Sequence, residues 1–183
     1  MSPRARGGLA PRLALGAALC CALTLAHAAP TLEKAPAPEF RAHDLDGHEV
    51  SLAALRAHGP VVVDFWATWC EPCREALLEL EGWRKLYGPR GLAIVAVSVD
   101  GPRNIAKVRP YVSRLKLGFP VVVDDDQRIQ KLYQATQMPT AFLVDRAGRV
   151  AATRIGYRRG ETTFVTRIEA LLPADSTAGD SAR

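Results

Sequence analysis

Apolar residues along this chain form short continuous runs, and each run is followed by a stretch suited to a helix. The runs are rich in Val, Ile and Ala, which is typical of strands that are covered on both faces. The predicted strands are residues 60–68, 91–100 and 118–126. The predicted helices are residues 71–87, 104–117 and 127–136. The middle of the chain is therefore expected to alternate strands with helices.

Helix-breaking residues stand at two places in this pattern. Gly88 and Pro89 should end the first helix, in which Leu80 and Trp83 recur at helical spacing. Pro110 lies inside the second predicted helix and should kink or split it, because proline lacks the N–H group of an intrahelical bond. We therefore expect a regular first helix and an interrupted second one.

Two hairpins are predicted, one before and one after this alternation. Residues 40–52 should form the first, with Asp46 and Gly47 at its turn. Residues 139–156 should form the second, with a turn at residues 146–148.

A closing helix completes the predicted fold. It should span residues 161–172, with Glu161 in its first turn, where a carboxylate faces the positive end of the helix dipole. Strands that alternate with helices, followed by a hairpin and a helix, predict an α/β fold. We expect a three-layer sandwich whose mixed central sheet of about five strands has helices on both faces, plus the N-terminal β-hairpin.

The two ends of the chain differ in composition from its middle. Residues 1–28 are predicted to be a signal peptide, because a basic stretch precedes an apolar one and an A-x-A cleavage signal stands at residues 26–28. An uncleaved membrane anchor is the alternative, although the apolar run is shorter than the ~20 residues of a span. Residues 29–38 should be an extended linker, residues 39–172 the folded domain, and residues 173–183 a disordered tail.

The charge of the chain means little once the predicted leader is set aside. The 183 residues, 48% of them hydrophobic, are enough for one domain with a sizeable core. The formal net charge is +5, but Arg4, Arg6 and Arg12 lie in the leader, so the rest of the chain carries about +2. No nucleic-acid partner is therefore expected. The protein is also expected to be a monomer.

Four cysteines become two in the predicted mature chain. Cys20 and Cys21 would leave with the leader, and Cys70 and Cys73 would remain at C-x-x-C spacing. A covalent loop this small removes little entropy from the unfolded chain, so a purely structural disulfide explains the pair poorly. Redox chemistry or metal binding is the expected use.

The two thiols differ in their position relative to the predicted helix. Cys70 falls where a strand meets the helix, and free backbone N–H groups there favour a thiolate, so Cys70 should attack first. Cys73 lies one helical turn further on and should resolve the mixed disulfide, which is exchange chemistry that needs no cofactor. Pro72 suits the start of a helix. Glu71 places a negative charge beside the sulfurs and disfavours the thiolate, so we expect this tuned pair to act as a reductant.

Three other functions of the cysteine pair have to be considered. A structural zinc site needs more ligands, but His43, His48 and His58 are isolated in loop-like sequence, so no bound metal is expected. A copper(I)-binding metallochaperone is the main alternative, since two thiolates can suffice for that ion. A thiol peroxidase has the pattern P-x-x-x-T-x-x-C, and Asp64 stands where a proline four residues before Thr68 would be needed.

Two motifs together resemble a known family. The stretch VVVDFWATWCEPC at residues 61–73 and the MPT at residues 138–140 are similar to the thioredoxin superfamily. The leader, the N-terminal hairpin and WCEPC are similar to its exported TlpA/ResA-type branch. The likeness covers residues 39–172, and it implies a thioredoxin-like fold with a redox-active Cys70–Cys73 disulfide.

The resemblance assigns roles to further residues. Pro139 would be a cis-proline that faces the disulfide, although only about 5% of X-Pro bonds are cis. Met138 and Thr140 flank it and would touch the backbone of the substrate. Trp69, next to the nucleophile Cys70, would be a partly exposed contact surface for partners, with a core-filling role as the alternative.

Two departures from the exported branch concern acidic residues. That branch usually has Asn at the position of Asp64 and an acid at the position of Ala76. Asp64 instead matches the buried acid of cytosolic thioredoxins. On a strand covered on both faces its carboxylate would be dry, which should raise its pKa toward neutrality. We expect Asp64 to take the proton of Cys73, with a solvated or salt-bridged aspartate as the alternative.

Residues and resemblance together predict an exported thiol:disulfide oxidoreductase that acts mainly as a reductase of protein disulfides. Its location would be periplasmic or otherwise extracytoplasmic. The resemblance implies re-reduction by a transmembrane thiol donor of the DsbD/CcdA type, because no reducing pool exists outside the cytoplasm. Clients would be proteins with disulfides or cysteine pairs, such as apocytochrome c in cytochrome c maturation or the copper-site cysteines of oxidase subunits.

Overall fold

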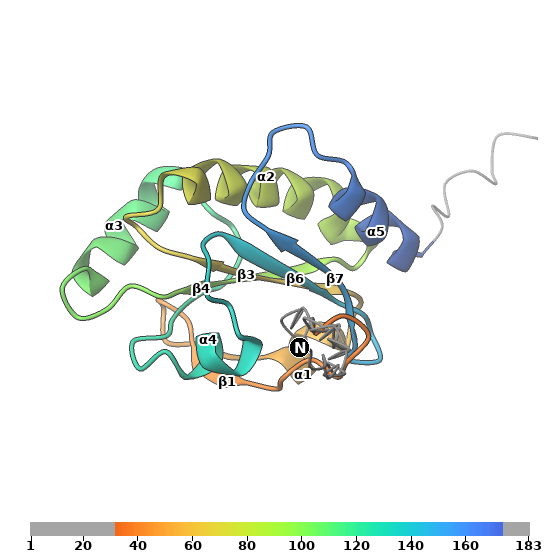
Figure 1. Cartoon of the computed structure of the whole chain (residues 1–183), viewed down its shortest axis with the longest axis horizontal. Coiled ribbons are helices and arrows are strands. Elements are labelled where there is room, and N and C mark those ends of the chain that lie inside the picture. Colours follow the sequence, from red (N-terminus) through yellow and green to blue (C-terminus); the bar gives the residue numbers. More distant parts are fainter. Residues whose placement is uncertain (1–31, 174–183) are drawn as a thin grey trace, which may run out of the picture. The chain divides into compact units, whose positions relative to one another are not determined.

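A sheet of five strands, in the order β5-β4-β3-β6-β7, forms the centre of the computed structural model, which describes residues 32–173 (Figure 1). The strands are β3 (Val61–Trp66), β4 (Ala93–Ser98), β5 (Val121–Val123), β6 (Thr140–Val144) and β7 (Val150–Ile155). β3 runs parallel to β4 and antiparallel to β6. β5 is parallel to β4, and β7 is antiparallel to β6. The predicted mixed sheet is confirmed.

Helices cover both faces of this sheet, with α2, α3 and α5 on one face and α1 and α4 on the other (Figure 1). The helices are α1 (Leu52–Arg56), α2 (Glu71–Tyr87), α3 (Ile105–Leu115), α4 (Arg128–Tyr133) and α5 (Thr163–Leu171). A short 3-10 turn, Gly88–Arg90, follows α2. The predicted three-layer α/β sandwich is confirmed, and α2 has the predicted bounds.

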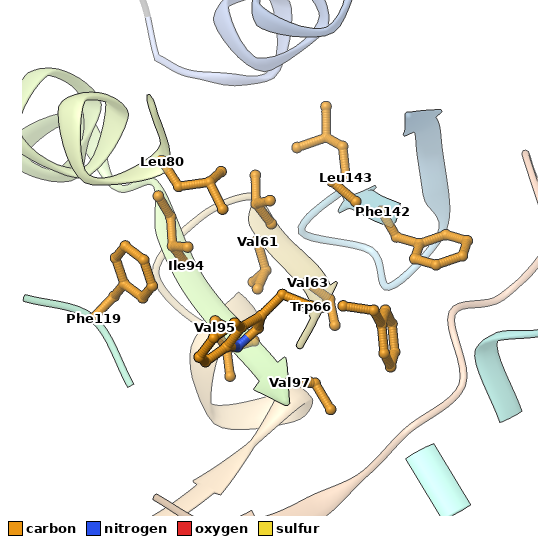
Figure 2. Packing of buried hydrophobic residues seen from close by; sticks show 14 of the residues in the cluster. Val61, Val63, Trp66, Leu80, Ile94, Val95, Val97, Phe119, Phe142 and Leu143 are labelled. Atoms are coloured by element: carbon orange, nitrogen blue, oxygen red, sulfur yellow. The ribbon is translucent and has the colours of Figure 1, made fainter. Parts of the chain in front are cut away.

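Strand β3 lies at the middle of the core and is buried along its whole length. Successive side chains of a strand point to opposite faces of the sheet, and Figure 2 shows Val61, Val63 and Trp66 within the packed apolar cluster. Phe65 contacts Tyr133 of α4, with ring centroids 5.3 Å apart. Trp66 contacts Tyr111 of α3 on the opposite face, at 5.4 Å. Asp64 has the same parity as Trp66 and therefore faces the layer of α2, α3 and α5.

The predicted N-terminal hairpin is confirmed as a separate two-stranded sheet of β1 (Arg41–His43) and β2 (Glu49–Ser51). Its turn is closed by the Asp44 carboxylate, whose Oδ1 accepts hydrogen bonds from the backbone N–H groups of Asp46 and His48, both at 2.9 Å. Gly47 has a φ of +87°, which explains why glycine suits the predicted turn.

Two helix predictions need correction. Helix α3 continues through Pro110, so the predicted split is wrong; the proline is exposed, and its ring displaces nothing in the core. Helix α5 begins at Thr163, two residues later than predicted, so Glu161 lies just before the first turn. Its Oε1 still accepts a hydrogen bond from the N–H of Phe164 at 3.1 Å, as a helix-capping carboxylate does.

Helix α1 has no counterpart among the predicted elements. Ser51 begins it by accepting a hydrogen bond from the N–H of Ala54 at 3.3 Å. Only Leu52 is buried within this helix, so no apolar spacing marks it in the sequence. A short helix of this kind is specified by its cap and by packing rather than by periodicity.

The described part of the segment predicted to be a linker is hydrogen-bonded to the hairpin of β6 and β7. The N–H of Lys34 donates to the carbonyl of Val150 at 2.7 Å, and the N–H of Ala37 donates to the carbonyl of Gly148 at 2.8 Å. The folded part therefore begins before Phe40, through backbone bonds that no side-chain pattern reveals. The predicted signal peptide and nearly all of the predicted tail lie outside the described residues. Within residues 32–173, no helix has the length and apolarity needed to cross a membrane.

Candidate active site

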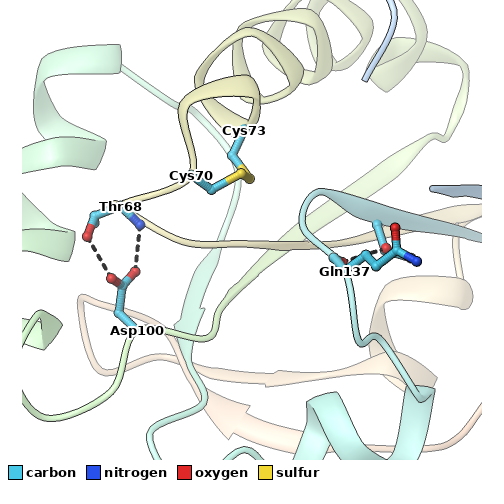
Figure 3. Close-up of a disulfide and its surroundings, with 6 residues drawn as sticks. Thr68, Cys70, Cys73, Asp100 and Gln137 are labelled. Carbon is cyan, nitrogen blue, oxygen red and sulfur yellow. Dashed lines mark hydrogen bonds between the residues drawn. A yellow bond between two sulfur atoms is a disulfide. The ribbon is translucent and has the colours of Figure 1, made fainter. Parts of the chain in front are cut away.

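The two cysteines form a disulfide at the start of α2 (Figure 3). Cys70 is the N-cap residue, directly after the loop that follows β3, and Cys73 lies in the first turn. Glu71 and Pro72 occupy the first two helical positions and are exposed. Cys70 retains 6% exposure, whereas Cys73 is fully buried. Of the two sulfur-bearing residues, Cys70 is therefore the one that a partner can reach.

The peptide bond between Met138 and Pro139 is cis, as the resemblance implied. Figure 3 shows the segment that carries Gln137 on the opposite side of the disulfide from Asp100. The Thr140 hydroxyl donates to the carbonyl of Gln137 at 2.7 Å, and Thr140 is buried. Met138 is half-buried, so its side chain remains partly accessible, while the side chain of Thr140 closes the loop.

Two tryptophans on either side of the β3–α2 loop differ in exposure. Trp66 is fully buried and fills the core against α3, but Trp69 is 62% exposed beside Cys70. A core-filling role for Trp69 is therefore excluded. Its indole presents an apolar surface next to the disulfide, which is the arrangement expected of a contact for partner polypeptides.

A buried carboxylate anchors this loop to β4, a feature that was not predicted. Asp100 Oδ2 accepts a hydrogen bond from the Thr68 N–H at 2.9 Å, and Oδ1 accepts one from the Thr68 hydroxyl at 2.6 Å (Figure 3). The Ser98 hydroxyl also donates to Asp100, at 2.8 Å. Thr68, two residues before Cys70, is thus held by two hydrogen bonds to the Asp100 carboxylate, and Ser98 of β4 makes a third hydrogen bond to the same group. An acid at the end of a predicted buried strand was the available signal.

Asp64 is fully buried in β3, and among the described residues neither of its oxygens has a hydrogen-bond partner. Its in-register neighbours are Ala96 on β4 and Ala141 on β6, which supply no polar group. Burial raises the pKa of Asp64 from 3.8 to about 7; Arg154 opposes this rise and Glu79 adds to it. A solvated aspartate is therefore excluded.

The surface of α2 that covers Asp64 carries Cys73. Cys73 and Ala76 are both fully buried on the side of α2 that faces the sheet, and Asp64 lies on the sheet face that α2 covers. The structure therefore brings together, in one dry layer, the buried thiol position and the only fully buried carboxylate on β3.

An ion pair between β7 and α2 is the second feature that was not predicted. Arg154 Nη1 donates to Glu79 Oε2 at 2.6 Å, and the arginine side chain is nearly fully buried. A charged residue at an inward position of the alternating strand β7 was the signal in the sequence. The described residues contain no cluster of three His, Cys, Asp or Glu side chains suited to a metal ion.

Fold and site together define a class of protein. A C-x-x-C disulfide at the N-terminus of a helix, placed after the central strand of a mixed sheet and accompanied by a cis-proline, makes this chain a thioredoxin-like thiol-disulfide oxidoreductase. The chain belongs to the AhpC/TSA family, whose sequence pattern matches residues 34–153.

Several known proteins are similar to this chain. Thiol-disulfide oxidoreductase ResA of Geobacillus kaustophilus is 36% identical over 114 residues, which are 62% of this chain and 64% of that protein. ResA of Bacillus thuringiensis is 35% identical over 125 residues, which are 68% of this chain and 70% of that protein. A thiol:disulfide interchange protein of Chlorobium tepidum, described as a thioredoxin family protein, aligns structurally with a TM-score of 0.64 at 25% identity, covering 74% of this chain and 94% of that one. This chain thus spans about two thirds of the length of the curated relatives.

Proposed function

We propose that this protein reduces disulfides of exported proteins by dithiol–disulfide exchange. The observation that carries the proposal is the unequal burial of the two cysteines at the start of α2, with Cys70 at the surface and Cys73 beneath it. An incoming disulfide therefore meets Cys70 first, next to the exposed ring of Trp69. The relatives named thiol-disulfide oxidoreductase support the same reaction class.

The reaction has two steps. The thiolate of Cys70 attacks one sulfur of a client disulfide, so that the client S–S bond breaks, a mixed disulfide forms, and the other client sulfur leaves as a thiolate. Cys73 then loses its proton and attacks the Cys70 sulfur, which releases the second client thiolate. Two electrons pass from the cysteine pair to the client, and the Cys70–Cys73 disulfide is the oxidised product.

Asp64 is the proposed acceptor of the Cys73 proton. A carboxyl group whose pKa lies at about 7 exchanges protons readily at neutral pH. The buried position of Cys73 leaves little access for bulk water as the base. Glu71, exposed at the first helical position, adds negative charge near the sulfurs and disfavours the thiolate, which favours a reducing couple.

Export and re-reduction complete the proposal. The predicted signal peptide would place the protein in the periplasm or another extracytoplasmic space, with an uncleaved leader as the tethered alternative. Such compartments lack a reducing thiol pool, so a transmembrane thiol donor of the DsbD/CcdA type would restore the dithiol. The candidate clients are cysteine pairs of exported proteins, including haem-site cysteines of apocytochrome c and copper-site cysteines of oxidase subunits.

Trapping with matched cysteine variants tests the assigned roles. Cys73→Ser should accumulate a stable mixed disulfide with insulin or with a disulfide-containing apocytochrome c peptide, because the resolving sulfur is gone. Cys70→Ser should accumulate far less. In the reduced wild-type protein, iodoacetamide should label Cys70 before Cys73. Peptide mass spectrometry measures the two labelling rates. Equal trapping by both variants, or equal labelling rates, would contradict the roles given to the two sulfurs.

Copper(I) titration under anaerobic conditions tests the alternative function. A reductase should precipitate insulin B chain in the presence of dithiothreitol, and it should do so without bound copper. Tight binding of one copper(I) ion per chain, with no reduction of insulin, would replace the proposed function by that of a copper-carrying protein.

A further inference from the structure

Asp64 and Arg154 lie on the same face of the sheet with one small residue between them. Asp64 on β3 pairs in register with Ala141 on β6, and Ala141 pairs in register with Arg154 on β7. Residues directly opposite one another in a sheet point to the same side, and neighbouring strands are ~4.8 Å apart. The backbones of Asp64 and Arg154 are therefore separated by roughly 10 Å, with only the methyl group of Ala141 between the side chains.

The Arg154 side chain is held in place from three directions. Its guanidinium carbon lies 5.0 Å from the ring centroid of Trp83 on α2, 5.1 Å from that of Phe164 on α5, and 5.9 Å from that of Tyr157. Nη1 is bonded to Glu79, whereas among the described residues Nη2 has no hydrogen-bond partner. A buried, fixed cation of this kind acts on neighbouring charges through a medium of low dielectric constant.

Few other charges face this layer. On the elements packed against this side of the sheet, the buried titratable or charged groups are Cys70, Cys73, Glu81 and Tyr87 of α2 and its N-cap, Asp100 after β4, and Arg154 on β7. Glu79 on α2 and Tyr111 on α3 are half-buried, and Glu169 on α5 reaches the layer through its hydrogen bond with Tyr87. Glu81 is paired with Arg84, and Glu169 accepts a hydrogen bond from Tyr87. Among these groups, Arg154 and Glu79 are the two whose charges act on Asp64.

We propose that Arg154 is a positioning residue for the exchange reaction: its charge, balanced by Glu79, sets the pH range in which Asp64 takes the proton of Cys73. This inference rests on the proposed function. The positive charge of Arg154 stabilises the Asp64 carboxylate, and the negative charge of Glu79 opposes it. The ion pair thus supplies a fixed charge on β7, balanced by one on α2, that acts on Asp64 from within the fold.

Substitutions of the two ion-pair partners should shift the pH at which Asp64 loses its proton in opposite directions. This difference distinguishes an electrostatic role from a structural one. Arg154→Met removes the positive charge, so Asp64 should hold its proton to higher pH. Glu79→Gln removes the negative charge, so Asp64 should lose its proton at lower pH. Both substitutions break the same ion pair, and a merely structural contribution would move both in the same direction. Arg154→Lys keeps the positive charge, so Asp64 should lose its proton at nearly the same pH as in the wild type.

The experiment follows the resolution step in single turnovers. Rapid mixing of the reduced protein with the chromogenic disulfide 5,5′-dithiobis(2-nitrobenzoate) should release thionitrobenzoate in two phases, and the slower phase reports the attack of Cys73. The pH midpoint of that phase should rise for Arg154→Met and fall for Glu79→Gln, each by on the order of one pH unit for a charge ~10 Å away in an effective dielectric of ~20. In an Asp64→Asn background, Arg154→Met should add no shift.

The possible outcomes separate this inference from the function on which it rests. Shifts of the same sign in Arg154→Met and Glu79→Gln, or no shift in either, would overturn the role of Arg154 while leaving the oxidoreductase intact. If Arg154→Met does not fold, Arg154→Lys and Glu79→Gln still decide: a shift as large in Arg154→Lys as in Glu79→Gln would refute the charge argument. A wild-type protein without a second phase, and without insulin reduction, would instead reject the proposed function.

Discussion

Replacing Asp64 by asparagine should make the protein more stable at alkaline pH, with almost no change at acidic pH. Asparagine has nearly the shape of a protonated aspartate but never ionises. Asp64 has no hydrogen-bond partner among the described residues, so the substitution removes no bond from its carboxylate. What it removes is the unfavourable ionisation of a carboxyl group in a dry layer.

The sign and size follow from the two pKa values of Asp64. Its pKa is 3.8 in the unfolded chain and about 7 in the folded protein, so the folded state holds the proton more tightly. The unfolding free energy therefore falls as the pH rises from about 4 to about 7 and changes no further above that range. Since each pH unit is worth ~1.4 kcal/mol, the wild type should lose up to ~4 kcal/mol that Asp64→Asn retains.

Urea unfolding of the oxidised protein at pH 5 and pH 8 measures this difference. The difference in unfolding free energy between Asp64→Asn and the wild type should increase with pH, because all other titrating groups contribute equally to both proteins. Asp124→Asn is a matched control, since Asp124 is also buried but accepts hydrogen bonds from the N–H groups of Ile129 and Gln130 at 3.1 and 2.8 Å. It should destabilise the protein at pH 8. A gap for Asp64→Asn that stays constant between the two pH values would refute the reasoning.

Two further predictions concern packing and the loop before the nucleophile. Gly59→Ala should destabilise the protein by about 1 to 3 kcal/mol in urea unfolding, because the new Cβ would lie 2.3 Å from the carbonyl oxygen of Gly91. Gly82→Ala, in open space on α2, should instead stabilise the protein by about 1 kcal/mol. If Gly59→Ala left the unfolding free energy unchanged, the backbone segments around Gly59 and Gly91 would have to be able to move apart freely. Asp100→Ala should slow insulin reduction several-fold by releasing the Thr68 loop, whereas Thr68→Ser should remain close to wild type. An Asp100→Ala protein with unchanged rate would mean that the loop needs no anchor.

The features that sequence reasoning found are those encoded within a short stretch of chain. Residues 60–68 form a continuous apolar run, so any acid inside it has to be buried, and Asp64 was predicted on that ground. The C-x-x-C motif follows within ten residues, which fixes its place at the start of the helix. The cis-proline at Pro139 has no such local signal, and its prediction came from the resemblance alone.

The features that sequence reasoning missed depend on strand register. Arg154 and Glu79 are 75 residues apart, and their meeting requires β7 to pair with β6 in one particular register. That register includes an irregularity between Leu143 and Val144, which no turn rule predicts. Thr68 and Asp100 are 32 residues apart and meet only because β3 and β4 are parallel neighbours. An inward-facing charge on a short strand is informative only after its neighbours are known.

The placement of the acid on β3 rather than on α2 has a physical consequence. Ala76 and Asp64 both lie in the layer between α2 and the sheet. An acid at the position of Ala76, as in the exported branch, would add a second carboxylate to this layer. The two carboxylates would repel each other, and one would be forced to stay protonated. A single acid with alanines on both neighbouring strands is instead governed by charges further away. Arg154 and Glu79 are such charges, and they are held by α2, α5 and β7 rather than by the loop that carries Trp69 and Cys70. The proton equilibrium of the site can therefore be set independently of the surface formed by Trp69, Cys70 and Met138.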